Sequence, residues 1–172
     1  MNHDLPPLIY NLCFLTRGDQ VLMLLRNKPP NRGLWNGVGG HIEPGESPLD
    51  SVLREVAEET GYRLPTARFC GLLTWEDFEI PTRGSPHAPL LAAGLYIFTA
   101  PAPEGEPHPT VEGKLAWKDR AYIFSSPEVV SNIHRFGPRV LDGAPPQVYH
   151  FAYRTGEILR HEVYPLPEGF HI

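Results

Sequence analysis

The sequence predicts an α+β or α/β sandwich, in which helices cover at least part of a β-sheet. Runs of strand-forming apolar residues recur along the chain, and one segment between them repeats its apolar residues every three to four positions. The chain also has 20 prolines and 16 glycines, which divide it into short elements joined by loops. With 172 residues, 41% of them hydrophobic, residues 1–172 are expected to form a single domain.

The first two strands are expected to form a β-hairpin. Leu8–Thr16 and Gln20–Arg26 are rich in Leu, and only Arg17, Gly18 and Asp19 separate them. A connection of this length that contains a glycine is a common hairpin turn.

A short glycine-rich strand segment is expected next. Pro29, Pro30 and Gly33 form a loop that ends the second strand, and Trp35–Glu43 follows it.

The next segment is predicted to be a helix on local signals alone. Ser47 is a good N-cap, Pro48 suits the first helical position, Asp50 occupies the capping-box position, and Gly61 suits the left-handed end. One stripe of the helix must pack on an apolar surface, expected to be the sheet. Its members are Leu49, Val52, Leu53, Val56 and Thr60.

Three further strands are expected after the helix, separated by loops. Their apolar, strand-forming segments are Ala67–Glu76, Leu90–Ala100, and Leu115–Trp117 with its neighbours. Ile80–Pro89 and Pro101–Pro109 are rich in proline and are expected to be loops.

The end of the chain predicts a second helix and a final hairpin. The helix is expected over Pro127–Phe136, started by Ser126. The hairpin is expected over Gln147–Tyr164, with its turn at residues 155–157.

The bulk properties exclude several classes of function. A net charge of −5 gives no electrostatic reason to bind long nucleic acid. Met1–Pro7 lacks a secretion signal and no long apolar span occurs, so the chain is expected to be cytoplasmic and not bound to a membrane. Cys13 and Cys70 lie far apart in apolar stretches and are expected to be buried, reduced thiols.

The predicted helix at residues 48–60 carries three glutamates that lie close together. Glu55, Glu58 and Glu59 are three and four residues apart, so they lie on neighbouring positions of the helix surface. Like charges at this spacing destabilise a helix unless something compensates them, and Mg²⁺ prefers oxygen ligands on a fixed scaffold. The three glutamates by themselves are also compatible with a solvated acidic face.

The wider spacing favours a catalytic motif. Five residues separate Gly40 from Glu46, seven separate Glu46 from Arg54, and the chain continues as REVAEETGY from Arg54 to Tyr62. This pattern resembles the Nudix box, with Tyr62 where that family usually has Ile, Leu or Val. The resemblance implies the Nudix fold, an α/β/α sandwich of the α+β class with the catalytic helix packed on a mixed β-sheet.

The resemblance also implies a role for each residue of the motif. The implied ligands of the catalytic Mg²⁺, or of Mn²⁺ in its place, are Glu55, Glu58, Glu59 and a backbone carbonyl near Gly39 or Gly40. Arg54 is expected to orient Glu55, because a guanidinium holds a carboxylate in one direction. Glu46 is expected to support the loop before the helix, either in a separate role or as a purely structural residue.

Three charged residues outside the motif are further candidates. In several members of the Nudix family a glutamate a few residues before a tryptophan strand reaches the metals, and here Glu112 precedes Trp117. Glu112 is therefore a candidate metal ligand or general base, with a surface loop glutamate as the alternative. Arg26 and Lys28 are candidates for phosphate contacts, or are solvated cations of a loop.

The segment Gly33–Gly40 and the final hairpin are similar to those of hydrolases of oxidised purine nucleoside triphosphates. That similarity implies substrate contacts by Trp35 and by Asn36, whose amide suits a purine edge. Those enzymes carry acidic residues in the helix after the tryptophan strand, where this chain has Ser131, Asn132 and His134. Asn132 is a candidate replacement for such an acid, or an exposed helix residue. Phe78 and Trp117 are candidates for stacking on a base, or pack in the core.

The leading hypothesis is a magnesium-dependent hydrolase that converts a nucleoside triphosphate, with an oxidised purine such as 8-oxo-dGTP as one option, to the monophosphate and pyrophosphate. The alternatives are another nucleoside diphosphate-linked substrate, such as ADP-ribose, a dinucleoside polyphosphate or an RNA 5′ end, and a non-catalytic nucleotide-sensing module. The expected partner is a small-molecule nucleotide, and the protein is expected to be a monomer or a homodimer.

Overall fold

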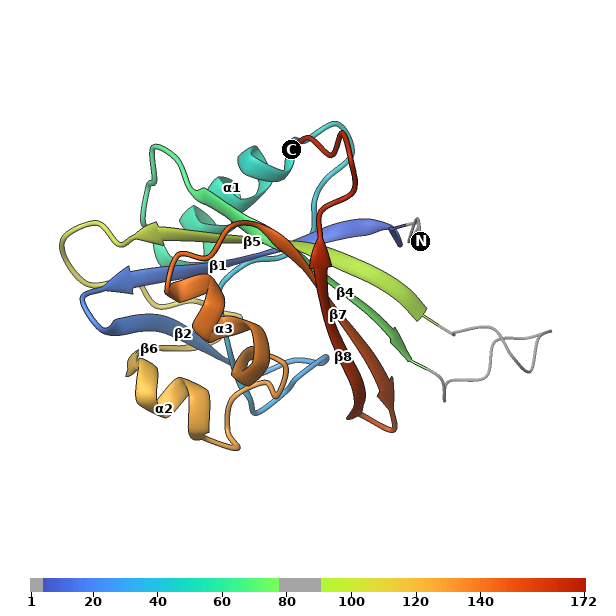
Figure 1. Cartoon of the computed structure of the whole chain (residues 1–172). Helices are drawn as coiled ribbons and strands as arrows, with labels where there is room; N and C mark the ends of the chain where they lie inside the picture. Colours follow the sequence, from blue (N-terminus) through green and yellow to red (C-terminus); the bar gives the residue numbers. More distant parts are fainter. Residues whose placement is uncertain (1–4, 78–90) are drawn as a thin grey trace.

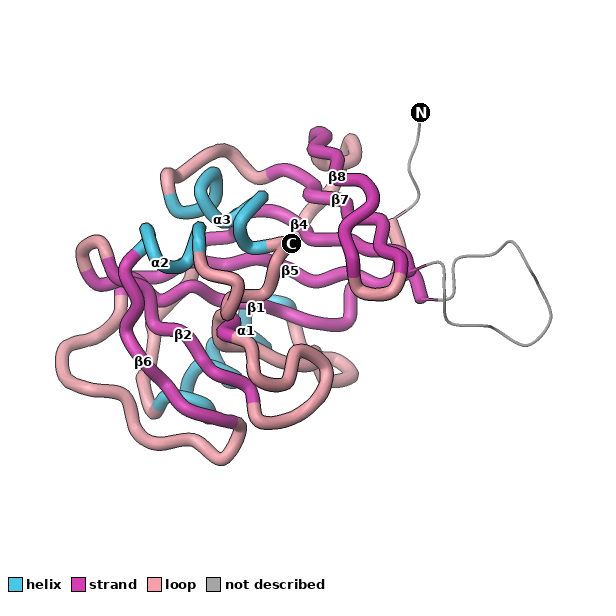
Figure 2. The backbone as a smooth tube through the Cα atoms, turned by 90° about the horizontal axis from the view of Figure 1, so that it is seen from below, coloured by secondary structure: helices cyan, strands magenta, loops and turns pink. Residues whose placement is uncertain are grey.

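A mixed β-sheet lies at the centre of the protein, with α1 on one face and α2 and α3 on the other (Figure 1). The computed structural model describes residues 5–77 and 91–172, and the sheet within these residues has eight strands. Their order is β3-β2-β1-β5-β4-β7-β8, with β6 paired to the free side of β2, so that β6 and β8 lie at the two ends of the sheet (Figure 2). This arrangement confirms the predicted α/β/α sandwich.

The first hairpin is confirmed, and its strands separate beyond the turn. β1 (Leu8–Arg17) and β2 (Gln20–Arg26) pair from Leu15↔Leu22 to Arg17↔Gln20. Farther from the turn, residues 35–41 lie between them. We call this region the sheet fork.

The predicted strand at Trp35–Glu43 changes partner inside the sheet fork. Its first part is β3 (Trp35–Asn36), which pairs with β2. Its second part runs beside β1, where Val38 and His41 form single bridges. The segment therefore links both arms of the fork, and it holds Gly39 and Gly40 between them.

The predicted helix is confirmed with its caps. α1 (Pro48–Thr60) begins after Ser47, whose side chain accepts a hydrogen bond from the backbone N–H of Asp50 at 3.0 Å. It ends at Gly61, which has a φ of 76°. Val52 and Val56 are fully buried and pack against apolar residues of β1 and β2.

The remaining strands lie within two residues of their expected positions where these were stated. They are β4 (Arg68–Asp77), β5 (Leu91–Pro101), β6 (Gly113–Asp119), β7 (Gln147–Arg154) and β8 (Glu157–Pro165). β1 pairs with β5 and β4 with β7 in parallel, which makes the sheet mixed. The final hairpin turns through residues 155 and 156, both with positive φ. The expected loop at Ile80–Pro89 lies outside the described residues.

The second predicted helix is wrong in its boundaries. The structure has α2 (Arg120–Ser125) before Ser126 and α3 (Ile133–Leu141) well after it. Between them Val129 forms a single parallel bridge with Trp35, whose N–H donates to Glu128 O at 2.8 Å and whose carbonyl accepts from Val130 N–H at 3.0 Å. Backbone pairing with a distant part of the chain therefore overrides the local preference of this segment for a helix.

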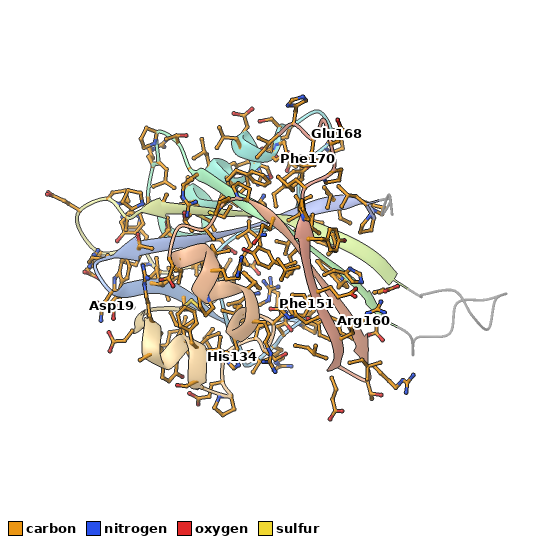
Figure 3. The ribbon with its side chains drawn as sticks, in the orientation of Figure 1. Asp19, His134, Phe151, Arg160, Glu168 and Phe170 are labelled. Carbon is orange, nitrogen blue, oxygen red and sulfur yellow. The ribbon has the colours of Figure 1, made fainter. Side chains whose placement is uncertain are left out.

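The C-terminal segment covers part of the α1 face of the sheet (Figure 3). Phe170 stacks on Phe69 with a ring-centroid distance of 6.1 Å and lies 6.4 Å from Tyr96. Both cysteines are buried free thiols, as expected. Within residues 5–77 and 91–172, no helix has the length and apolar character needed to span a membrane.

Candidate functional site

The sheet fork lies directly against the carboxylates of α1. A Cβ placed on Gly40 would lie 2.5 Å from the carboxyl carbon of Glu55, so a larger residue would displace this carboxylate from its present position. The N–H of Gly39 donates to Glu59 Oε2 at 2.9 Å. The two predicted glycines and two of the three predicted glutamates therefore meet at one place.

Arg54 gathers the acidic side chains around it. Its Nε and Nη2 donate to the two oxygens of Glu46 at 2.8 and 2.9 Å, in a bidentate pair. Its Nη1 donates to Glu55 Oε1 at 2.9 Å and to Glu58 Oε2 at 3.3 Å. The expected contact between Arg54 and Glu55 is present, and Glu46 shares the same guanidinium.

A buried polar network joins the fork to the helix, and sequence reasoning did not identify it. Asn11 Nδ2 donates to Ser51 Oγ at 2.8 Å, while Asn11 Oδ1 accepts from Gly40 N–H at 3.3 Å. Ser51 Oγ donates to His41 O at 3.2 Å. Asn11 is 3% exposed and Ser51 is fully buried, so these bonds fix the distance between Gly40 and α1. A single asparagine inside an apolar strand was the available signal.

The carboxylates of the site differ in their electrostatic surroundings. Burial raises the pKa of Glu59 to about 7, against the hydrogen bond from Gly39, and nearby Glu55 and Glu112 raise it further. Burial also raises the pKa of Glu55, although Arg54 opposes the shift. The hydrogen bonds from Arg54 lower the pKa of Glu46 to about 2. Glu46 thus stays an anion paired with Arg54, Glu55 shares that guanidinium with it, and the buried charge of Glu59 is opposed mainly by the N–H of Gly39.

Two of the three charged candidates outside the motif lie within electrostatic range of Glu59. Beyond burial, which is the main cause of its raised pKa, Glu112 raises this pKa and Arg26 lowers it. Lys28 Nζ forms an ion pair with Glu112 Oε1 at 3.1 Å. The structure therefore places Arg26, Lys28 and Glu112 at the same end of β2 as the α1 carboxylates.

The donor set fits a hard divalent cation. The two carboxylates of Glu55 and Glu59 lie beside backbone atoms of Gly39 and Gly40, and Mg²⁺ prefers oxygen ligands of this kind. Among the described residues, no three acidic, histidine or cysteine side chains already converge on one point, because Glu55 is bound to Arg54 and Glu59 to Gly39. An ionised carboxylate that accepts one hydrogen bond keeps a second oxygen for a metal ion, so both contacts are compatible with ligation.

The predicted substrate residues lie in several parts of the structure. Trp35 is 6% exposed and packs in the core, with Lys118 Nζ 4.4 Å from its ring centre. Asn36 is half-buried in β3, and its Oδ1 accepts from Gly37 N–H at 2.9 Å. Asn132 precedes α3 and donates to Tyr153 Oη at 3.0 Å.

Of the two stacking candidates, Trp117 lies apart from these residues. Trp117 packs with the apolar residues on the α1 face of the sheet, where Arg17 lies 4.1 Å from its ring centre. It pairs with Leu22, whereas Arg26 lies four residues farther along β2. Phe78 lies outside the described residues.

A cluster of three aromatic rings lies next to Gly40, and sequence reasoning did not identify it. Tyr10 lies 4.4 Å from His41 and 6.1 Å from Trp75 between ring centroids. Tyr10 and Trp75 are half-buried, so part of each ring is open to solvent. Trp75 packs against the core on the α3 face of the sheet, the face that carries Asn132. No local spacing links these residues, because they come from β1, from β4 and from the segment after β3.

Comparisons with known proteins agree with the fold and the motif. A family model described as the NUDIX domain matches residues 9–140. The uncharacterized Nudix hydrolase YvcI of Bacillus subtilis is 34% identical over 108 residues, which cover 62% of this chain and 63% of that protein. The oxidized purine nucleoside triphosphate hydrolase of Mus musculus is 28% identical over 109 residues, or 63% of this chain and 64% of that protein.

Structural similarity extends over more of the chain. The crystal structure of the mMutator MutT protein from Bacillus halodurans has a TM-score of 0.76 and 30% sequence identity, and the match covers 92% of this chain and 98% of that one. The chain spans slightly less than two thirds of the two curated relatives, at 63% and 64% of their lengths.

Proposed function

The chain belongs to the Nudix family, and from that membership we propose that it is a magnesium-dependent hydrolase of nucleoside triphosphates, which releases the monophosphate and pyrophosphate. The observation that carries the proposal is the convergence of Glu55 and Glu59 of α1 with Gly39 and Gly40 at the sheet fork. Bound Mg²⁺ supplies positive charge against the phosphates and activates water there.

The residues of the chain have separate tasks in this proposal. Glu55 and Glu59, with Glu58 at the exposed side of the helix, hold the metal together with a carbonyl near Gly39 or Gly40. Arg54 keeps Glu55 and Glu58 on one side of the helix, and its charge is balanced by Glu46. The same residues can exchange Mg²⁺ for Mn²⁺, because both prefer oxygen ligands.

We assign phosphate binding and proton transfer to residues at the end of β2 and just before β6. Arg26 and Lys28 are cations within reach of the carboxylate site and are the proposed phosphate contacts. Water attacks phosphorus, the bond to the bridging oxygen breaks, and the proton of the water passes to a carboxylate, for which Glu112 is the candidate. Pyrophosphate and the monophosphate then leave.

The base is proposed to bind on the α3 face of the sheet. Trp75 and Tyr10 offer partly open aromatic rings and Asn132 offers an amide near α3, while Asn36 offers an amide within the sheet fork. An oxidised purine is the favoured base, because the mouse relative bears the name of an oxidized purine nucleoside triphosphate hydrolase and the chain keeps the Trp35–Asn36–Gly37 segment. The ring of Trp35 is buried, so we propose that Trp35 contributes to substrate binding by holding Asn36 and Gly37 in place.

Pyrophosphate release from a panel of triphosphates tests the proposal. We expect release with Mg²⁺ and its loss with a chelator, and the fastest turnover with an oxidised purine. No release from any triphosphate would remove the proposal, and turnover of ADP-ribose, dinucleoside polyphosphates or capped RNA in the same screen would favour the alternative substrates. Binding of a nucleotide without turnover of any compound would favour a sensing module.

Three statements about the whole protein stay predictions. They are that residues 1–172 form a single domain, that the protein acts in the cytoplasm, and that it is a monomer or a homodimer.

A further inference from the structure

Asn27 attaches the turn that carries Glu112 to the end of β2. We call residues 110–113 the β6 entry turn. Asn27 N–H donates to Glu112 O at 3.2 Å, and Asn27 Nδ2 donates to Val111 O at 2.9 Å. One residue therefore binds two successive carbonyls of the turn.

The β6 entry turn has no apolar anchor of its own. The Val111 side chain is 83% exposed, so it contributes almost no burial. Within the turn, Glu112 N–H donates to Thr110 Oγ1 at 3.2 Å, and Thr110 bridges Gly113. These local bonds set the shape of the turn, but they do not set its position relative to β2. The hydrogen bonds from Asn27 do that at the Val111–Glu112 end.

β2 also carries Arg26, the residue before Asn27. Arg26 pairs with Gly113 on the ladder, and a Cβ on Gly113 would lie 2.0 Å from Leu25 O, so the two strands approach closely here. The end of β2 thus fixes the position of Glu112 relative to Arg26. Both residues act electrostatically on Glu59. A shift of the turn would move Glu112 away from this position relative to Arg26.

We propose that Asn27 is a positioning residue for Glu112: by binding the carbonyls of Val111 and Glu112, it holds the turn that carries the Glu112 carboxylate at the Arg26 end of β2 before substrate binds. The inference rests on the proposed function, in which Glu112 acts at the metal or on the attacking water. Lys28 binds the same carboxylate from solvent, at 60% side-chain exposure, and cannot replace this backbone attachment.

A double-mutant cycle tests the proposal. Asn27→Ala is expected to lower kcat about tenfold, as loss of a supporting hydrogen-bond partner commonly does, with KM changed less than about twofold. In the Glu112→Gln background the same change should lower kcat less than about twofold, because no carboxylate is left to position. Equal losses in both backgrounds, or an unchanged kcat in Asn27→Ala, would overturn the proposal.

Two further variants separate positioning from folding. Asn27→Asp keeps the size of the side chain but cannot donate to Val111 O, so it should lose kcat as Asn27→Ala does. Val111→Thr changes only an exposed side chain of the same turn and should keep wild-type kcat. Thermal unfolding of all variants within about 4 °C of the wild type shows that they fold. Loss of kcat in Val111→Thr would count against the proposal.

Hydrogen exchange gives a readout that does not depend on turnover. Asn27→Ala should speed amide exchange in the peptide that covers residues 107–114 by about tenfold, since the turn opens locally, while peptides from α1 keep wild-type rates. Exchange at the wild-type rate in that peptide would overturn the inference even if the protein is an active hydrolase. Conversely, faster exchange in a protein that hydrolyses no nucleotide would support the attachment of the β6 entry turn by Asn27, while the proposed function fails.

Discussion

In the metal-free protein, the unfolding free energy of Glu59→Gln minus that of the wild type should increase as pH rises. The pKa of Glu59 is raised to about 7 in the folded protein from an ordinary value of 4.5. Between these values the folded state binds the extra proton, so folding stability falls as pH rises, and the full cost is present above pH 7. Glutamine carries no charge and removes this dependence.

The magnitude follows from the size of the shift. At about 1.4 kcal/mol per pKa unit, ionised Glu59 costs the metal-free fold about 3 kcal/mol at pH 8. Glutamine can still accept the hydrogen bond from Gly39, while its buried amide N–H₂ adds a cost of about 1–3 kcal/mol that does not change with pH. The stability of Glu59→Gln minus that of the wild type should therefore grow by about 2–3 kcal/mol between pH 5 and pH 8.

Urea unfolding in the presence of a chelator measures this difference at both pH values. Glu58→Gln is the matched control, because the Glu58 side chain is 60% exposed and its replacement should shift stability by less than about 0.5 kcal/mol at either pH. Added Mg²⁺ should stabilise the wild type and not Glu59→Gln, and the variant should lose most of its turnover. A stability difference that stays constant from pH 5 to pH 8 would refute the assignment of Glu59 as a buried, under-compensated carboxylate.

Further predictions concern other parts of the site. Gly40→Ala should lower kcat by about 10- to 100-fold, because its Cβ displaces the Glu55 carboxylate, and a kcat within twofold of the wild type would contradict this. Arg54 lowers the pKa of Glu46 in the folded protein, so the wild type has a stabilisation above pH 4.5 that it loses as pH falls through about 2. Glu46→Gln should lack this stabilisation, and acid unfolding curves of the same shape in both proteins would count against it. Trp75→Ala should raise the nucleotide KM by about tenfold with little change in kcat, as expected for lost stacking, and an unchanged KM would remove Trp75 from the base site.

The catalytic helix was predictable because its signals are local. Ser47, Pro48 and Gly61 fix its ends through backbone geometry that depends only on neighbouring residues, and the structure has these ends. The strands followed in the same way from apolar runs and turn residues.

The region after β6 was not predictable from local signals. Ser126 and Pro127 favour a helix start, but Trp35, which lies far earlier in the chain, forms a backbone bridge with Val129 and bonds to Glu128 and Val130 on either side of it. Sequence patterns report the preference of a segment and cannot include a partner that folding brings to it.

The candidate site divides in the same way. Glu55, Glu58, Glu59 and Arg54 share one helix, so their spacing already predicts their neighbourhood. Asn11, Trp75 and Asn27 lie in other segments, and only the fold shows that Asn11 joins Gly40 to α1, that Trp75 lies near Tyr10 and that Asn27 binds the turn of Glu112. The roles proposed for them, as positioning groups or a stacking surface, leave no periodic signal.

A structure with Mg²⁺ and a non-hydrolysable nucleotide tests the central claim most directly. We predict an ion bound by oxygens of Glu55 and Glu59 at about 2.1 Å, next to the backbone of Gly39 or Gly40, with the phosphates of the nucleotide on the same ion. Glu55 still held by Arg54 and Glu59 still held by Gly39, with no ion between them at saturating Mg²⁺ and nucleotide, would contradict it.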